Sequence, residues 1–175
     1  MSNLVSSSGV VATDVTGVGT ARSELAAAGY STDKAIFGYG YTGSRVSMTN
    51  LVSNSGVIAT DTTGVGTSRS GLGAARYGTD KAIFGYGTTG SNTAITNLVS
   101  NSGVVASDTS GVGTARRALG AAPYGGDKAI FGYGVVSSVT SVSNLVNNVG
   151  VVASDVSGVG TARQLIGAVA FSTSA

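Results

Sequence analysis

Residues 81–87 read KAIFGYG, and this stretch decides the fold class. Ala82, Phe84 and Tyr86 alternate with Lys81, Ile83 and Gly85, which is the period of two expected for a β-strand. Three further short segments surround it, each rich in small, β-branched or aromatic residues and bounded by Gly, Asn or Asp. They are residues 67–78 (TSRSGLGAARYG), 94–102 (AITNLVSNS) and 103–113 (GVVASDTSGVG). The pattern predicts four short strands and no helix.

The same segments recur along the whole chain with a fixed period. Asn3, Asn50, Asn97 and Asn144 are each 47 residues apart. The Asp14, Arg22 and Lys34 series keep the same step. Residues 48–94 and 95–141 are identical at 33 of 47 positions, with no insertion or deletion. The chain of 175 residues is therefore a tandem array, which we treat as one repeat domain with units 1–33 (partial), 34–80, 81–127 and 128–175.

Four short strands in a unit of this length are typical of one blade of a β-propeller. A β-solenoid is the competing architecture, but its coils are usually shorter and would show a shorter sub-period. We therefore expect an all-β fold, a propeller of about four blades. The small-residue runs 25–28, 72–75, 119–122 and 165–168 predict strands packed close to the axis.

The order of these segments resembles a kelch repeat. The likeness is carried by RSGLGAARYG (69–78), TDKAIFGYG (79–87) and TNLVSNSG (96–103), and it extends over the whole chain. The paired glycines of the kelch strand are interrupted here, because Gly85 and Gly87 flank Tyr86, and the kelch tryptophan is absent. The repeats are also similar to those of bacteriophage tail-fibre-type and environmental proteins, a resemblance that implies a virion or extracellular, surface-binding role.

The array is 13 residues short of four full units of 47 (188 − 175). The missing piece corresponds to residues 35–47, the second strand and its loop. A blade can be framed to begin at NLVS or at the TAR segment, and the sequence leaves both framings open. Unpaired strand edges invite pairing with another chain. We expect closure into one ring, completion of a ring by a second chain, or stacking into a filament, so a homo-oligomer is an expected state.

Composition excludes several functions. The chain has no Cys, His or Trp, so it has no disulfide, no usual zinc site and no imidazole for a catalytic triad. A net charge of +2 from few charged residues does not favour nucleic acid. No apolar run is long enough for membrane insertion, and no signal peptide is evident. GVGTAR matches no phosphate-binding motif. We expect no enzyme, no cofactor and no metal.

Most charged residues belong to repeat series that cancel. Each of Asp14, Asp61, Asp108 and Asp155 lies eight residues before an arginine of the repeat series, and we expect it to cap a turn or to pair with that arginine within a blade or across blades. Asp33–Lys34, Asp80–Lys81 and Asp127–Lys128 are neighbours at a turn that begins a strand. The four charges outside these series are Glu24, Arg45, Arg76 and Arg117.

Two groups of residues are candidates for ligand contact. Tyr39, Tyr86 and Tyr133 carry a polar group that could reach solvent, although core packing is the competing interpretation. The segments 41–48, 88–95 and 135–142 differ between units while their flanks are nearly identical. Loops on a rigid scaffold often carry binding residues, which selects Tyr41, Arg45 and Asn92. The sequence thus predicts a non-enzymatic module that contacts glycan or protein through these loops. The alternative is a self-assembling structural subunit, natural or engineered, that pairs strand edges between chains.

Overall fold

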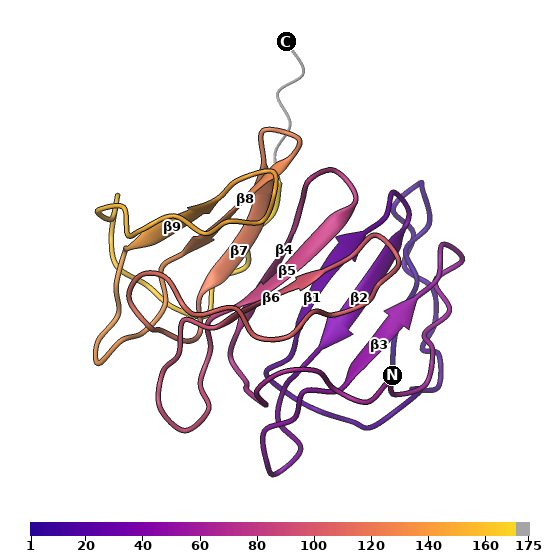
Figure 1. Cartoon of the computed structure of the whole chain (residues 1–175). Helices are drawn as coiled ribbons and strands as arrows, with labels where there is room; N and C mark the ends of the chain where they lie inside the picture. Colours follow the sequence, from indigo (N-terminus) through magenta and orange to yellow (C-terminus); the bar gives the residue numbers. More distant parts are fainter. Residues whose placement is uncertain (171–175) are drawn as a thin grey trace.

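A computed structural model describes residues 1–170 of the protein. The chain forms three antiparallel sheets of three strands each, placed one after another along the sequence (Figure 1). Sheet 1 comprises β1 (Ala26–Tyr30), β2 (Lys34–Gly38) and β3 (Thr49–Val52). Sheet 2 comprises β4 (Gly73–Tyr77), β5 (Lys81–Gly85) and β6 (Thr96–Val99). Sheet 3 comprises β7 (Gly120–Tyr124), β8 (Lys128–Gly132) and β9 (Ser143–Val146).

The KAIFG stretch is the central strand of every sheet, as its alternating pattern predicts. In sheet 2, Ile83 lies opposite Ala75 of β4 and Leu98 of β6. A tight turn joins β4 to β5, with Gly78 and Thr79 at positive φ (57° and 67°). Among the described residues the structure contains strands and turns and no helix, so the all-β prediction is confirmed.

The predicted fourth strand is only a partly paired segment. Beside β6, two isolated bridges join Thr96 to Thr109 and Val99 to Val105. Three steps along β6 therefore face four steps along the outer segment, which is the count of a β-bulge. The side chain of Asn97 occupies the interrupted ladder, because its amide donates to Ala106 O at 3.0 Å. The outer segment is thus held by a polar side chain as well as by its backbone.

The sheets pack on one another through an aromatic ring and a glycine. Phe84 of sheet 2 lies against Gly38 of sheet 1, where a Cβ would come within 2.6 Å of the ring. Tyr39 meets the same ring edge-on at a centroid distance of 5.2 Å. Phe131 contacts Gly85 and Tyr86 in the same way. The glycine is needed because any side chain would push the two sheets apart.

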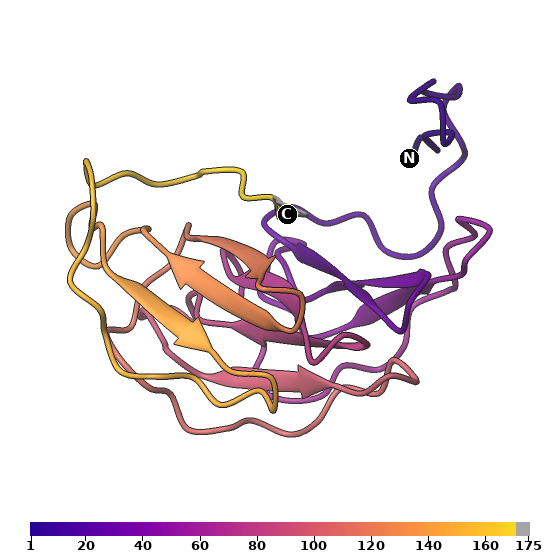
Figure 2. The ribbon, with the colours of Figure 1, turned by 90° about the horizontal axis from the view of Figure 1, so that it is seen from above.

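The inner strands β1, β4 and β7 contact one another in sequence. Each sheet starts after a TAR segment, so of the two framings the one that begins there describes the sheets. The described residues form no closed ring. Residues 1–15 make a separate hairpin that projects from the sheet 1 end, and residues 157–170 run from the sheet 3 end (Figure 2).

Candidate functional site

The positions that differ most between units lie together on one edge of the array. In sheet 1, isolated bridges join Ser23 to Tyr41 and Tyr41 to Arg45. The amide of Ser23 donates to Tyr41 O at 3.0 Å, and the amide of Tyr41 donates back at 2.8 Å. The start of the inner strand and the β2–β3 loop therefore form one short ladder. It lies at the end of the sheet where β1 begins and β2 ends.

Sheets 2 and 3 repeat this ladder with other side chains. Ser70 pairs with Thr88 and Thr88 with Asn92, while Arg117 pairs with Val135 and Val135 with Val139. We call this surface the variable rim. It comprises residues 23–24 and 41–45, residues 70–71 and 88–92, and residues 117–118 and 135–139.

A depression of about 440 Å³ lies inside the variable rim. Four equivalent positions of successive units line it: Glu24, Gly71, Ala118 and Leu165. A chain of backbone hydrogen bonds links them, because each amide donates to the carbonyl of the preceding one at 2.8–3.0 Å. All four have positive φ, between 52° and 62°. The backbone of this wall is thus constant, whereas its side chains change from unit to unit.

Three of the four charged residues that lie outside the repeat series are on the variable rim. Glu24 and Arg117 line the depression, and Arg45 closes the loop of sheet 1. Arg76 lies elsewhere, inside β4. Tyr41 is 40 % exposed, and Leu165 beside the depression is 82 % exposed. Sequence reasoning selected the loops but missed the positions before the inner strands. Their signal was present in the unmatched charges at positions 24 and 117.

Asn92 joins two units of the rim. Its amide nitrogen donates to Val135 O at 3.0 Å and to Val136 O at 2.9 Å. Its amide oxygen accepts from the guanidinium of Arg117 at 3.0 Å. The structure therefore gives Asn92 a positioning role between sheets 2 and 3. Of the other predicted loop residues, Tyr41 is exposed, whereas Arg45 is half-buried and its Nε is covered.

The tyrosine series does not lie on the rim. Tyr39 and Tyr86 are fully buried, and their hydroxyls donate to Val65 O and Val112 O at 3.1 and 3.0 Å. Burial raises the pKa of both phenols. The expectation that these two rings contact a ligand is therefore corrected, because neither ring nor hydroxyl is accessible. Tyr133 is half-buried under Arg163, whose guanidinium lies 4.0 Å from the ring centroid.

The repeated arginines and aspartates form an internal framework. Arg69 is fully buried, lies 4.1 Å above the Tyr39 ring and donates to Asn97 at 2.6 Å. Asn97 in turn donates to Asp108 at 2.9 Å, and the amide and hydroxyl of Thr67 donate to the same carboxylate. The guanidinium of Arg69 lies 4.0 Å from the Asp108 carboxylate, and that of Arg22 lies 3.7 Å from Asp61. The predicted pairing of aspartate with a repeat arginine therefore occurs across sheets, with the arginine of the preceding unit and not with the one eight positions later.

The framework holds its carboxylates ionised. Hydrogen bonds from Thr20 and Asn50 lower the pKa of Asp61. For Asp108, burial acts to raise the pKa, but hydrogen bonds from Thr67 and Asn97 outweigh it and the pKa is lowered. The predicted turn pairs form at two of three places, with Lys81 3.0 Å from Asp80 and Lys128 2.7 Å from Asp127.

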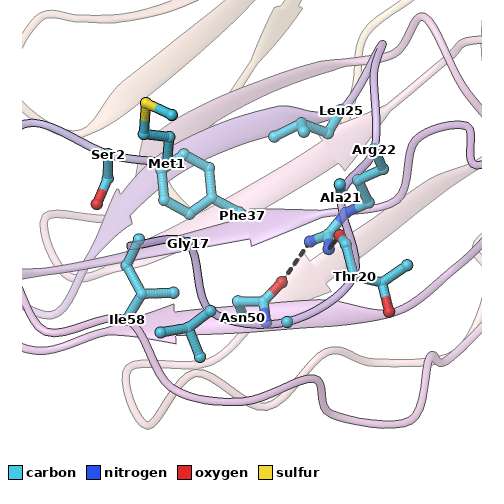
Figure 3. Close-up of a pocket in the computed structure, with 12 residues that line it drawn as sticks. Met1, Ser2, Gly17, Thr20, Ala21, Arg22, Leu25, Phe37, Asn50 and Ile58 are labelled. Atoms are coloured by element: carbon cyan, nitrogen blue, oxygen red, sulfur yellow. Dashed lines mark hydrogen bonds between the residues drawn. The ribbon is translucent and has the colours of Figure 1, made fainter. Parts of the chain in front are cut away.

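A second hollow, of about 400 Å³, lies at the sheet 1 end (Figure 3). The ring of Phe37 points into it beside Met1, and Arg22 bonds Asn50 at its floor. Phe84 and Phe131, the equivalents of Phe37, each pack on a glycine of the preceding sheet. This hollow is therefore the uncovered half of a sheet–sheet contact.

Residues 1–170 contain no group of three acidic side chains that could hold a metal ion. No helix in this part of the chain is long and apolar enough to cross a membrane.

Comparisons with known proteins bear on the fold alone. No protein family and no curated protein matches the sequence. Among solved structures, one described as "Structure of YjhT" is similar, with a TM-score of 0.56 and 14 % sequence identity. The match covers 72 % of this chain and 42 % of the other, so this chain spans less than half the length of that protein.

Proposed function

We propose that the protein is a non-enzymatic binding module that recognises another protein through the variable rim. The observation that carries this proposal is the segregation of sequence differences. Residues 48–94 and 95–141 are identical at 33 of 47 positions, and six of their 14 differences fall at the seven rim positions of the unit, where the ladders read Ser70–Thr88–Asn92 in sheet 2 and Arg117–Val135–Val139 in sheet 3. The remaining eight differences are spread over the other 40 positions of the unit, so the scaffold varies most at the rim, as in proteins that bind through loops on a rigid frame.

The chemistry of the rim suits a protein surface. Tyr and Arg are the residues most often found as anchors of protein interfaces, and Tyr41 and Arg45 are neighbours here. In the sheet 3 part of the rim, the apolar side chains of Val136 and Val139 are 38 % and 44 % exposed beside Arg117. The framework carboxylates are engaged by Thr and Asn side chains, so they are not free for acid–base chemistry.

The finer fold belongs to the same proposal. We infer that the three sheets are blades of a kelch-like β-propeller arc. The inner strands lie side by side, the rim depression lies where such an axis would open, and the bulged outer segments supply the fourth strand of each blade.

Binding by matched variants tests the function. The rim variant carries Tyr41→Ala, Arg45→Ala and Arg117→Ala. The control carries Ser7→Ala, Asp33→Ala and Asn54→Ala in exposed turns away from the rim. Both are compared with the wild type on displayed protein fragments and on a glycan panel. We expect fragments that bind the wild type and the control and lose at least tenfold affinity for the rim variant. Binding to glycans alone, or binding that the rim variant retains, would contradict the proposal.

A further inference from the structure

The N-terminal hairpin, residues 1–15, carries one half of a contact set that the sheets contain in full. Asn3 donates to Ala12 O at 3.0 Å and to Asp14 at 2.8 Å. Asn50 makes the same two bonds, to Ala59 O at 3.1 Å and Asp61 at 2.8 Å. In sheet 1, Thr20 also donates a hydrogen bond to Asp61, and Arg22 donates one to Asn50. Within residues 1–170, no threonine or arginine donates to the pair in the hairpin.

The C-terminal segment, residues 158–168, carries the other half. It sits on sheet 3 as the start of a further unit would, because Tyr133 donates to Val159 O at 3.1 Å and Arg163 covers the Tyr133 ring. Thr161 and Arg163 are the equivalents of Thr20 and Arg22. Both are exposed, and in the described part of the chain neither side chain bonds an Asn or Asp.

A third contact fixes the position of the hairpin. The turn at Gly103 lies against Tyr30 and Leu51, and the turn at Gly150 lies against Tyr77 and Leu98. These contacts leave Tyr30 3 % and Tyr77 2 % exposed.

The third member of that series has no turn on it. Tyr124 is 37 % exposed and Leu145 39 %. The glycine that continues the turn series is Gly9 of the hairpin. Its φ of 78° is close to the 82° of Gly103, and a Cβ on it would meet nothing within 4 Å.

We propose that the hairpin of a second copy docks on sheet 3 and completes a shared sheet with the C-terminal segment. Gly9 of that copy covers Tyr124 and Leu145. Its Asn3 accepts a hydrogen bond from Arg163, and its Asp14 accepts one from Thr161. Because each copy carries both halves, the contact is head-to-tail and extends to chains or closed rings.

The occupant is a second copy because the hairpin is tied to its own sheet 1. Leu4 lies against Gly56, and Thr20 is held by Asp61 through its amide and its hydroxyl. These contacts hold the hairpin at the sheet 1 end of the array (Figure 2), whereas residues 158–168 lie on sheet 3.

Two variants with complementary defects test this proposal. The hairpin variant carries Gly9→Asn and Asp14→Ala. We call the surface that receives the hairpin, Tyr124 and Leu145 with Thr161 and Arg163, the socket. The socket variant carries Tyr124→Ser and Thr161→Ala. If Tyr124→Ser unfolds the chain, Thr161→Ala alone replaces it. The control carries Gly43→Asn and Asp33→Ala. Like Gly9, Gly43 has a positive φ, at 106°, and open surroundings, and it lies in the β2–β3 loop of sheet 1, away from sheet 3.

Molar mass is measured by light scattering up to about 1 mM chain, where even weak contacts are populated. We expect the wild type and the control to exceed 17.0 kDa and each defective variant to remain at 17.0 kDa. An equimolar mixture of the two defective variants should reach twice that mass and no more, since one intact junction remains. A wild type of 17.0 kDa throughout, as in a ring closed by its own hairpin, overturns the proposal. So does a monomeric mixture or a monomeric control.

Discussion

Residues 1–15 and 48–62 have nearly the same sequence and fold into the same hairpin, but only the second belongs to a sheet. In both, the asparagine bonds a backbone carbonyl and an aspartate. Asn50 is 3 % exposed and also accepts a hydrogen bond from Arg22. Asn3 is exposed, and in the described residues no arginine donates to it. Local sequence is therefore enough for the hairpin and its internal bonds. Burial and the arginine come from another segment of the array.

The largest difference between interior and end positions is expected for phenylalanine. Phe84 is fully buried between sheets 1 and 2, whereas Phe37 faces an open hollow. Phe84→Ala should lower the free energy of unfolding by about 3–5 kcal/mol, because it leaves a cavity at a packed junction. Phe37→Ala should cost about 1 kcal/mol in dilute protein. Urea unfolding of both variants measures the contrast, and equal losses would contradict it.

Asparagine offers the same comparison at a polar site. Asn97→Ala removes the partner of Arg69 and Asp108 in a buried network and should cost about 2 kcal/mol. Asn3→Ala removes two exposed bonds and should cost less than about 0.5 kcal/mol in dilute protein. Thermal unfolding of the two variants checks this prediction. A loss for Asn3→Ala as large as for Asn97→Ala would mean that the hairpin is already docked in the monomer.

Acid should reduce the contribution that the hydrogen-bonded framework carboxylates make to stability. The pKa values of Asp61, Asp108 and Asp155 are lowered in the folded protein from an ordinary 3.8. Folding therefore disfavours their protonation. Their contribution to stability is full above the ordinary value and is lost as pH falls through the lowered values. The urea midpoint should be constant from pH 7 to about pH 5 and fall toward about pH 2. A midpoint that stays constant over that whole range would contradict this assignment.

The smallest effect on stability is expected at the rim. Tyr41 is 40 % exposed, and its backbone rather than its side chain makes the ladder bonds. Tyr41→Ala should change the free energy of unfolding by less than about 0.5 kcal/mol. Tyr39→Ala, two residues earlier, removes a buried ring under Arg69 and serves as the contrast. A large loss for Tyr41→Ala would show that the rim is part of the framework.

Periodicity predicted most of the fold. The alternation in KAIFGYG identified β5 and, through the 47-residue period, β2 and β8. The fourth segment was harder to predict, because the Asn97 side chain takes over part of the ladder and only the folded chain brings it to Ala106. For a similar reason the sequence did not identify which arginine pairs with each aspartate. Asp108 meets Thr67 and Arg69 of the preceding unit and not the arginine eight positions later.

The candidate site was predicted in part. Differences between units selected Tyr41 and Arg45, which lie on the rim. They gave no reason to exclude Tyr39 and Tyr86, because an alternating pattern does not reveal which face of a strand is covered by the next sheet. Position 24 carries a charge outside the repeat series, but only the folded chain shows that it lines the depression and that its carbonyl accepts from the amide of Gly71.

Hydrogen exchange in the wild type tests most directly the claim that the ends of the array are two halves of one interior contact. The hairpin 1–15 is compared with residues 143–156, which form the same hairpin on sheet 3. At low concentration we expect residues 143–156 to be protected and residues 1–15 to exchange fast. At high concentration residues 1–15 should gain protection in the wild type and not in Gly9→Asn. Exchange of residues 1–15 that is independent of concentration would contradict the account.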